Sequence, residues 1–376
     1  MRIFGTTLLL AWTILLLYIT WRAATVPAIA RRVARPLLAA LAAALWASFV
    51  VGRLLGGDGG GRAAALLELV GMHALAAVFI FAVPLLAVDV ATGFGLLMRS
   101  RVGALRGWAL VAGLAMTGVA LVQGTRPPEV ITHEVRLAGL PPALDGTVIA
   151  ALSDFHLGAL LDGEWLAARV AQVDALRPDV VVLLGDLLEG HGAPLRSLAA
   201  GLRGFRAPLG VYAVTGNHEY HGGRDDAVSV LEEAGVQVLR DRWVELRPGL
   251  VLAGVDDLTA RRRRGEAGDF AGAALAGRPP GATVLLSHSP LELERAAAAG
   301  AGLVLCGHTH GGQIWPFGYL VRRSYPHLAG RYQVGGATVI VSRGAGTWGP
   351  RMRLWRRGEI LKVVLKGRSR GLQNSL

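Results

Sequence analysis

The sequence predicts two parts in order, a helical membrane domain over residues 1–127 and an α/β domain over residues 128–376. In the first part, long apolar segments are flanked by eleven arginines and only three acidic residues. In the second part, short apolar runs alternate with helix-like segments, a pattern typical of an α/β sheet. The net charge of +12 therefore comes mainly from the flanks of apolar segments. Such flanks indicate membrane topology signals rather than a nucleic-acid surface.

Four segments approach the roughly 20 apolar residues that a membrane-crossing helix needs. They are residues 3–21, 37–55, 64–98 and 108–122. We expect the first to be a retained helix rather than a cleaved signal peptide, because "YITWRAATV" is a poor small-residue cleavage site. The third is longer than one crossing requires, so a tilt, a kink at Pro84 or an extension past the interface all stay open.

Arginines in the short loops predict how these helices are oriented. With four crossings, seven arginines fall on one side of the membrane and four on the other. The larger group is Arg22, Arg31, Arg32, Arg35, Arg99, Arg101 and Arg106, and the smaller is Arg2, Arg53, Arg62 and Arg126. The larger group is expected in the cytoplasm, which places the second domain outside it, at a bacterial inner (plasma) membrane.

Two polar residues interrupt the third apolar segment. Asp89 is either a functional group or a residue near the interface in an over-long helix, because an unpaired charge inside a bilayer is costly. His73 is expected to be packed or interfacial. The prolines of "GTRPPEVITHEV" then mark a linker into the second domain.

Five short apolar runs in the second part each end in a glycine or serine, followed by a residue that can bind a metal. The runs are "TVIAALSDFH", "VVVLLGD", "GVYAVTGNH", "ATVLLSH" and "GLVLCGHTH". Such runs predict buried strands. Ligands of open α/β sheets bind beyond the carboxyl ends of strands, where these polar residues fall. They are Asp154, His156, Asp186, Asn217, His218, His288, His308 and His310.

The series D-x-H, G-D, G-N-H-E, a later H and G-H-x-H resembles the calcineurin-like metallophosphoesterase family over residues 148–310. The segments "GHTHGGQIWPFGYLV" and "SRGAGTWGPRMRLWRRGEI" also resemble a membrane-anchored bacterial subgroup of that family. The resemblance implies a four-layer αββα sandwich, in which two mixed sheets pack face to face with helices outside.

The polar residues at the strand ends suit two divalent metal ions, with Mn, Fe and Zn all open. Asp186 is the natural bridging carboxylate, because it is the lone carboxylate at the strand end between the other clusters. By resemblance, the first metal also takes Asp154, His156 and His310, and the second also takes Asn217, His288 and His308. His308 and His310 are two residues apart, so both can point to the same side.

The resemblance leaves His218 free of the metals and implies that it contacts the phosphate or protonates the leaving oxygen. The expected reaction is hydrolysis of a phosphoester or pyrophosphate bond by a metal-activated hydroxide. Glu219 is a candidate to orient His218, with a surface position as the alternative. Asp257 is a candidate to support a metal ligand, and Gln313 to touch substrate.

The expected partners are a phosphorylated substrate, with a lipid-linked one among the options, and the lipid bilayer itself. No nucleic-acid partner is expected, because no aromatic-basic groove is evident. The alternative function is a metal-binding regulatory or sensor domain attached to a membrane module. Monoester or diester (phosphodiesterase) preference and oligomeric state stay open. His191 and His221 do not fit the ligand pattern and are expected at the surface or the rim of the site.

Overall fold

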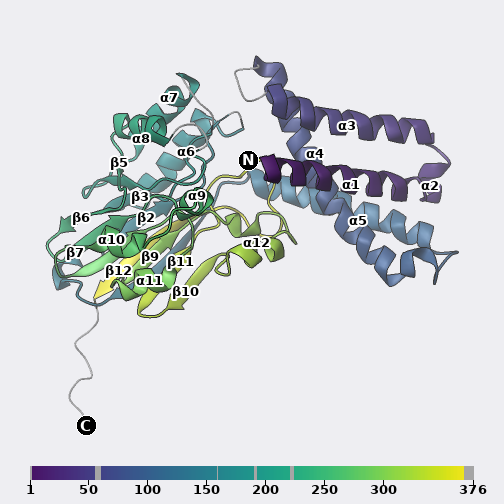
Figure 1. Ribbon diagram of the computed structural model, residues 1–376. Helices are drawn as coiled ribbons and strands as arrows, with labels where there is room; N and C mark the ends of the chain where they lie inside the picture. The colour runs from purple at the N-terminus through teal and green to yellow at the C-terminus, as the bar shows by residue number, and fades with distance from the viewer. Residues whose placement is uncertain (1, 56–60, 159, 190–192, 221–223, 368–376) are drawn as a thin grey trace, which may run out of the picture. The chain divides into compact units, whose positions relative to one another are not determined.

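The computed structural model describes residues 2–55, 61–158, 160–189, 193–220 and 224–367, and these form two compact units (Figure 1). The helical unit contains the chain up to Arg126 together with Gly349–Arg356. The sandwich unit contains Pro127–Trp348 and the chain from Arg357 onward. A short segment late in the chain thus belongs with the N-terminal helices.

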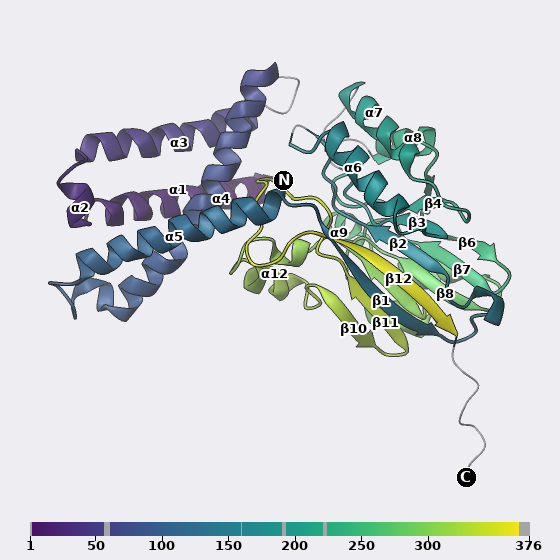
Figure 2. The same ribbon diagram turned by 180° about the vertical axis from the view of Figure 1, so that it is seen from behind.

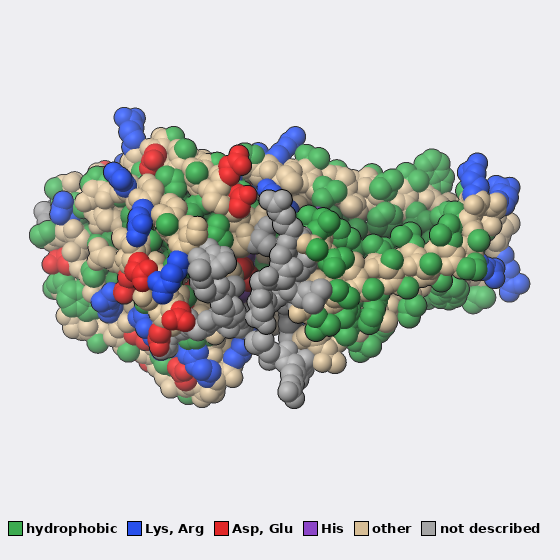
Figure 3. Space-filling view, turned by 90° about the horizontal axis from the view of Figure 1, so that it is seen from above, with side chains coloured by type: hydrophobic (Ala, Val, Ile, Leu, Met, Phe, Trp, Pro, Cys, Tyr) green, Lys and Arg blue, Asp and Glu red, His purple; other side chains and the backbone are tan. Residues whose placement is uncertain are grey.

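The helical unit is built from helices that run back and forth. Its helices are α1 (Arg2–Ala23), α2 (Pro27–Ala30), α3 (Arg35–Leu55), α4 (Gly61–Ala91) and α5 (Val102–Thr125), with a 3₁₀ turn, η2 (Gly93–Gly95). Four of them, α1, α3, α4 and α5, are long and apolar enough to cross a membrane, which agrees with the four predicted apolar segments. Figure 3 shows hydrophobic side chains over much of the visible surface of this unit and basic side chains at one end of it.

The third crossing ends earlier than its apolar sequence suggests. Helix α4 contains Pro84 and stops at Ala91, although the apolar stretch continues to Met98. The turn η2 follows, in which Phe94 adopts a left-handed φ of 57° between two glycines. Glycine readily adopts such angles and ends helices. The long apolar segment is therefore a helix plus a glycine-rich turn rather than one extended helix.

Asp89 is fully buried where α1 and α4 end and α5 begins. Arg106 donates to its Oδ1 through Nε at 2.9 Å and Nη2 at 2.7 Å. The Nε of Arg22 lies 2.6 Å from its Oδ2, and the Tyr18 hydroxyl donates to the same oxygen at 2.8 Å. Asp89 therefore pairs with two cations, which offsets the cost of burying its charge.

The segment Gly349–Arg356 packs against α4 and α5. Its Met352 and Leu354 are buried, and its Arg353 N–H donates to Ala120 O at 2.9 Å. The Arg351 N–H donates to Nε2 of His73 at 3.2 Å. His73 is therefore packed against this returning segment, which is one of the two positions expected for it.

The sandwich unit contains two six-stranded sheets. The order of the first sheet is β1-β12-β2-β3-β4-β5, and that of the second is β10-β11-β9-β8-β7-β6. Figure 2 shows the side where β1 and β12 lie together, although the chain places them more than 200 residues apart. The first sheet comprises β1 (Glu129–Leu137), β2 (Val148–Leu152), β3 (Val180–Leu183), β4 (Val211–Ala213), β5 (Gln237–Val238) and β12 (Glu359–Gly367). The second comprises β6 (Arg242–Arg247), β7 (Leu250–Gly254), β8 (Ala282–Leu286), β9 (Leu303–Cys306), β10 (Gly330–Val334) and β11 (Ala337–Val341).

Alternating strand residues build three layers of core. On β3, Val180 and Val182 face the core between the sheets, while Val181 and Leu183 face the helices. The first sheet is covered by α6 (Gly163–Asp174), α7 (Ala193–Ala200) and α8 (Arg224–Glu233), and the second by α9 (Leu258–Arg263), α10 (Phe270–Leu275) and α11 (Leu293–Ala298). The remaining elements are η3 (Pro142–Leu144), η4 (Gly201–Gly204), η5 (His310–Gly312) and α12 (Gly318–Ser324). The layers follow the order αββα, which confirms the predicted sandwich.

Parallel pairing brings the predicted polar strand ends to one edge. In the first sheet β2, β3 and β4 are parallel, and in the second β7, β8 and β9 are parallel. Their carboxyl ends therefore lie along one edge of each sheet, where ligands of α/β sheets bind.

Candidate metal centre

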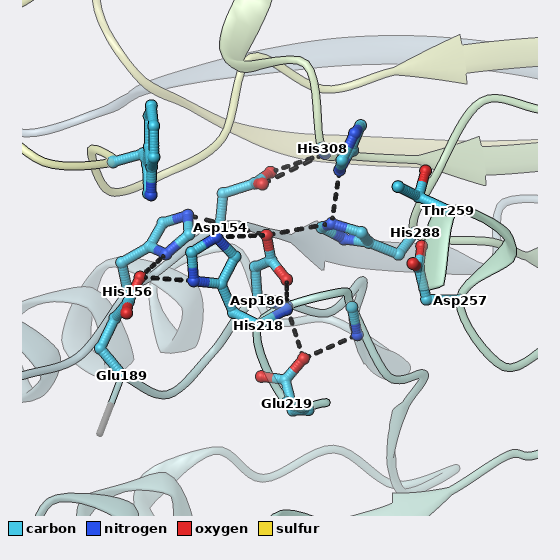
Figure 4. A network of polar contacts seen from close by, with 12 residues as sticks. Asp154, His156, Asp186, Glu189, His218, Glu219, Asp257, Thr259, His288 and His308 are labelled. Carbon is cyan, nitrogen blue, oxygen red and sulfur yellow. Dashed lines mark hydrogen bonds and ion pairs between the residues drawn. The ribbon is translucent and has the colours of Figure 1, made fainter. Parts of the chain in front are cut away.

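The loops that follow five parallel strands meet in a cluster of carboxylates and imidazoles (Figure 4). Asp154 and His156 follow β2, Asp186 follows β3, and Asn217 and His218 follow β4. From the second sheet, His288 follows β8, and His308 and His310 follow β9. The cluster therefore draws on both sheets, and most of its side chains are buried.

The backbone of this cluster is bent into an uncommon conformation. Left-handed φ angles between 50° and 74° occur at Asp154, His156, Asp186, His308 and His310. Non-glycine residues rarely adopt such angles, and where they do the residue often belongs to a functional site. A Cβ on Gly216 would lie 2.2 Å from Asp186 Oδ1, so only glycine fits beside that carboxylate.

One group of donor atoms joins Asp154, His156 and His310. The Nε2 atoms of the two histidines lie 3.1 Å apart, and His310 Nε2 lies 3.4 Å from Asp154 Oδ1. His156 Nδ1 contacts the carboxylate of Glu189 at 2.6 Å. Because Nδ1 carries the proton toward that carboxylate, Nε2 of His156 presents its lone pair to the group.

A second group joins Asp186, His288 and His308. His288 Nε2 lies 3.2 Å from Asp186 Oδ2 and 3.2 Å from His308 Nδ1. The Nδ1 of His288 donates to Leu184 O at 2.6 Å, which leaves its Nε2 facing the other two donors. In the loop after β4, Asn217 immediately precedes His218, whose N–H donates to Asp186 Oδ1 at 2.8 Å.

Asp186 lies between the two groups. Its Oδ2 is 3.2 Å from His288 Nε2 in the second group and 3.9 Å from His156 Nε2 in the first. One carboxylate thus faces imidazoles on both sides, as a ligand shared by two cations would.

Glu189 is a site residue that the sequence analysis missed. It lies three residues after Asp186, and its Oε1 is 2.6 Å from His156 Nδ1 and 2.8 Å from His218 Nδ1. One carboxylate therefore orients two imidazoles. The signal in the sequence is a second acid in the same loop as Asp186, in "GDLLEG", three residues beyond the acid that directly follows the strand.

Glu219 is buried and does not lie on the surface, which was the alternative considered for it. Its carboxylate accepts backbone N–H groups of Gly216 at 2.7 Å, Leu187 at 2.7 Å and Asp186 at 3.0 Å. These bonds join the loops after β3 and β4. Glu219 therefore holds the backbone at Asp186 and Leu187 against that at Gly216, whereas it is Glu189 that accepts a hydrogen bond from the His218 ring.

Asp257 and Gln313 lie around the cluster. Asp257 accepts from the Ala260 N–H at 2.6 Å at the start of α9 and from the Ser289 hydroxyl at 2.5 Å. The Gln313 amide donates to Trp348 O and accepts from Trp348 N–H, both at 3.0 Å. Both side chains thus fix the backbone near the centre. His191 and His221 lie outside the described residues.

The charges of the cluster set the protonation states of its members. Burial would raise the pKa of Asp186, but the neighbouring His288 and His218 hold that pKa well below its usual value. Burial and then the charge of His288 lower the pKa of His308 to about 3. Metal ligation needs an ionised carboxylate and a neutral imidazole, and these are the forms favoured at Asp186 and His308. Burial instead raises the pKa of Asp154. Burial would lower the pKa of His288, but the charge of Asp186 raises that pKa, so a bound cation would displace protons from both groups.

The donor set fits divalent metal ions. In each group, ligand atoms of two imidazoles and a carboxylate lie within 4.8 Å of one another, an arrangement that a cation between them would stabilise. No donor among the described residues reaches the buried Oδ1 of Asn217, an acceptor that a metal would satisfy. The residues present therefore match carboxylate, imidazole and amide coordination.

Comparison with known proteins agrees with this geometry. The family profile described as calcineurin-like phosphoesterase matches residues 147–312. A Bos taurus protein named transmembrane protein with metallophosphoesterase domain is 36% identical over 298 residues, covering 75% of this chain and 67% of that protein. A metallophosphoesterase of Campylobacter jejuni is 32% identical over 262 residues and covers 69% of each chain. Another, of Aquifex aeolicus, is 35% identical over 239 residues, covering 63% of this chain and 91% of that protein.

The residues that match the family profile, 147–312, lie within the sandwich unit, and the Bos taurus protein is also named as a transmembrane protein. The residues at the strand ends supply the ligand types that divalent metals take. The chain therefore belongs to the calcineurin-like metallophosphoesterase family and is a metal-dependent phosphoesterase that carries four helices able to cross a membrane.

Proposed function

We propose that this protein is a membrane-anchored phosphohydrolase that uses two metal ions to cleave phosphoester or pyrophosphate bonds. The observation that carries the proposal is the convergence of two groups of donor atoms on Asp186, whose Oδ2 faces His288 on one side and His156 on the other. A single-metal site would not need a carboxylate placed between two imidazole groups.

The proposed ligands divide between the two groups. Asp154, His156 and His310 would hold one ion, Asn217, His288 and His308 the other, and Asp186 both. Mn, Fe or Zn bound there would supply Lewis-acid activation of a water molecule and would neutralise charge on the phosphoryl oxygens. The protein prepares this set by fixing ring orientations, through Glu189 at His156 and through the Leu184 carbonyl at His288.

His218 is proposed to be the proton donor of the reaction. Burial would lower its pKa, but the charges of Asp186 and Glu189 raise the pKa of His218 to about 9. Glu189 accepts from Nδ1 at 2.8 Å, and Nε2 lies 3.9 Å from Oδ2 of Asp186. A protonated imidazole in this position can donate to a phosphate oxygen or to the leaving oxygen.

The sandwich unit is proposed to lie outside the cytoplasm at a bacterial inner membrane. Arg31, Arg32, Arg35, Arg99 and Arg101 are all exposed at one end of the helical unit, around the α1–α3 and α4–α5 connections. Basic loops favour the cytoplasmic side. The chain leaves α5 at the opposite end, so the domain that follows would be extracytoplasmic. Fusions of alkaline phosphatase and a fluorescent protein to the C-terminus test this, and only the phosphatase fusion should be active.

The activity is tested with the full chain in nanodiscs after reconstitution with Mn²⁺. We expect about two bound ions per chain by elemental analysis, and hydrolysis of bis-p-nitrophenyl phosphate or p-nitrophenyl phosphate. Asp186→Asn should lose nearly all activity and at least one ion, because the amide cannot bridge as a carboxylate does. Arg196→Gln removes only an exposed ion pair with Glu233 and serves as the matched control.

Two results would contradict the proposal. Fewer than one ion per chain after careful reconstitution would remove the metal centre. Two bound ions without turnover of any phosphomonoester, phosphodiester or pyrophosphate would favour the alternative function, a metal-binding sensor domain attached to the membrane helices.

A further inference from the structure

The exposed large apolar side chains of the sandwich unit are gathered in one place. Among its described residues they are Trp315, Phe317, Tyr319, Leu320 and Trp348, with exposed fractions from 37% to 64%. Four of the five fall within six consecutive residues that lead into α12. A soluble surface rarely concentrates its exposed apolar groups in this way unless that surface binds something.

Helix α12 is not one of the covering helices of the sandwich. It stands apart from α10 and α11 in Figure 1. Tyr319 and Leu320 on its first turn are 64% and 53% exposed. Its last turn carries Arg322 and Arg323, which are exposed and form no ion pair with other described residues. We call residues 315–325 the aromatic segment.

Both ends of the aromatic segment are tied to the metal centre. It begins five residues after His310, and at its other end the Tyr325 ring packs on the His308 ring, with centroids 4.6 Å apart. The Tyr325 hydroxyl lies 2.8 Å from Thr259 Oγ1, which fixes that end. Whatever the aromatic segment binds is therefore held close to the residues proposed to bind metal.

We propose that the aromatic segment inserts into the headgroup region of the bilayer and that the centre acts on phosphate groups of membrane-embedded lipids. The choice of a bilayer rests on composition, because Trp, Tyr and Phe next to arginines are typical of membrane interfaces. Arg322 and Arg323 complement the negative charge of anionic lipids. Chain continuity agrees, since Gln313 bonds Trp348, and the next residue, Gly349, begins the segment that packs on the membrane helices.

The substrate part of this inference rests on the proposed function, whereas the docking part does not. Insertion of the aromatic segment would bring the lipid headgroups to His308 and His310 without lifting a lipid out of the bilayer. The substrate class is then a phosphoester or pyrophosphate whose leaving group or retained group carries acyl or prenyl chains.

Docking is tested by fluorescence in nanodiscs of phosphatidylethanolamine and phosphatidylglycerol that hold one copy of the full chain. The only native thiol, Cys306, is fully buried, so Tyr319→Cys can be labelled selectively with an environment-sensitive dye. Glu232→Cys, an exposed position on α8, is the matched control. We expect lipids with a nitroxide at the headgroup to quench the dye at position 319 and not at 232.

The absence of quenching at position 319 would overturn the docking proposal. Quenching that appears only when two copies share a disc would also overturn it, and would assign the surface to a second copy of the chain. Replacing Arg322 and Arg323 by Gln should weaken quenching in anionic discs and leave it unchanged in neutral ones.

The substrate class is tested with a second pair of assays. The double variant Tyr319→Ser/Leu320→Ser is assayed with the p-nitrophenyl ester of phosphatidic acid in vesicles. Its KM should rise at least about tenfold, because the serines bury less apolar surface in the bilayer than Tyr and Leu do. Its kcat/KM for soluble bis-p-nitrophenyl phosphate should not change, which also shows that it folds. Equal KM values for the vesicle substrate would overturn the lipid assignment. If the wild type hydrolyses neither substrate, the proposed function fails, while the quenching result still decides docking.

Discussion

Glu189 connects the proposed ligand His156 with the proposed proton donor His218. A single carboxylate that holds Nδ1 of both rings fixes which nitrogen each ring presents to the centre. The orientation of a ligand and the position of a proton donor thus depend on one side chain that itself belongs to neither proposed metal site.

We therefore predict that Glu189→Gln lowers kcat/KM about 10- to 100-fold, the usual cost of losing a residue that orients a metal ligand. Metal content should stay near that of the wild type, because both groups of ligands remain. Glu189→Asp, which keeps the charge on a shorter side chain, should recover part of the loss. Kinetics on bis-p-nitrophenyl phosphate and elemental analysis measure these effects, and an unchanged kcat/KM would show that Glu189 does not orient the rings.

Most of the centre was predictable from the sequence, because its residues directly follow β-branched runs. Asp154, Asp186 and His308 each lie within two or three residues of a strand end. The strand therefore largely fixes the position of each side chain. Glu189 lies further along its loop, and the position of a carboxylate there depends on how the loop folds back. Sequence spacing alone does not encode that path.

Among the helices, the end of the helical unit at Asp89 is unusual because three charges are buried together. Asp89 is fully buried, and Arg22 and Arg106 are each only 4% exposed. Arg22 also stacks on Trp21, with its guanidinium 3.7 Å from the ring centroid. The cluster links α1, α4 and α5, so its ion pairs hold the same end of all three helices together.

Asp89→Asn should destabilise the helical unit by about 3 kcal/mol or more, because both arginines would remain buried without a counter-charge. A lower melting temperature of the full chain in detergent, followed by circular dichroism, measures this effect. Arg99→Gln changes an exposed loop arginine and should leave the melting temperature unchanged. A wild-type melting temperature for Asp89→Asn would mean that water or lipid reaches the cluster.

For the helices, the apolar pattern of the sequence predicts their number but not where each one begins and ends. Apolar length predicts four crossings, but not the end of α4, because "FGLLM" after it is as apolar as the helix. Conversely, α5 begins before its apolar stretch, since Arg106 in its first turns is neutralised by Asp89. A contact between residues distant in the chain thus accounts for the start of α5, whereas the glycine-rich turn η2 ends α4.

At the scale of the whole molecule, the centre joins the two sheets of the sandwich. The loops of the first sheet supply Asp154, His156, Asp186 and Asn217, and those of the second supply His288, His308 and His310. Metal ions bound between them would cross-link two layers that otherwise meet through apolar packing. Metal should therefore stabilise the whole sandwich and not only its loops.

Cys306 gives a direct measurement of this coupling, because it is the only thiol and is fully buried on β9. In moderate urea, labelling of Cys306 should be about a hundredfold slower when free Mn²⁺ is a hundred times its dissociation constant. Asp186→Asn should lose most of that protection. Equal labelling rates with Mn²⁺ and with a chelator would show that metal binding and folding of the sandwich are independent.

The return of Gly349–Arg356 to the helical unit also governs how the protein can be made. The ribosome has synthesised the chain through Trp348 before this last piece of the helical unit exists, so packing of that unit cannot be complete when α5 emerges. Nor can recombination exchange the anchor by a single crossover, since its parts lie on both sides of the catalytic sequence. Anchor and hydrolase are thus inherited as one interleaved gene segment.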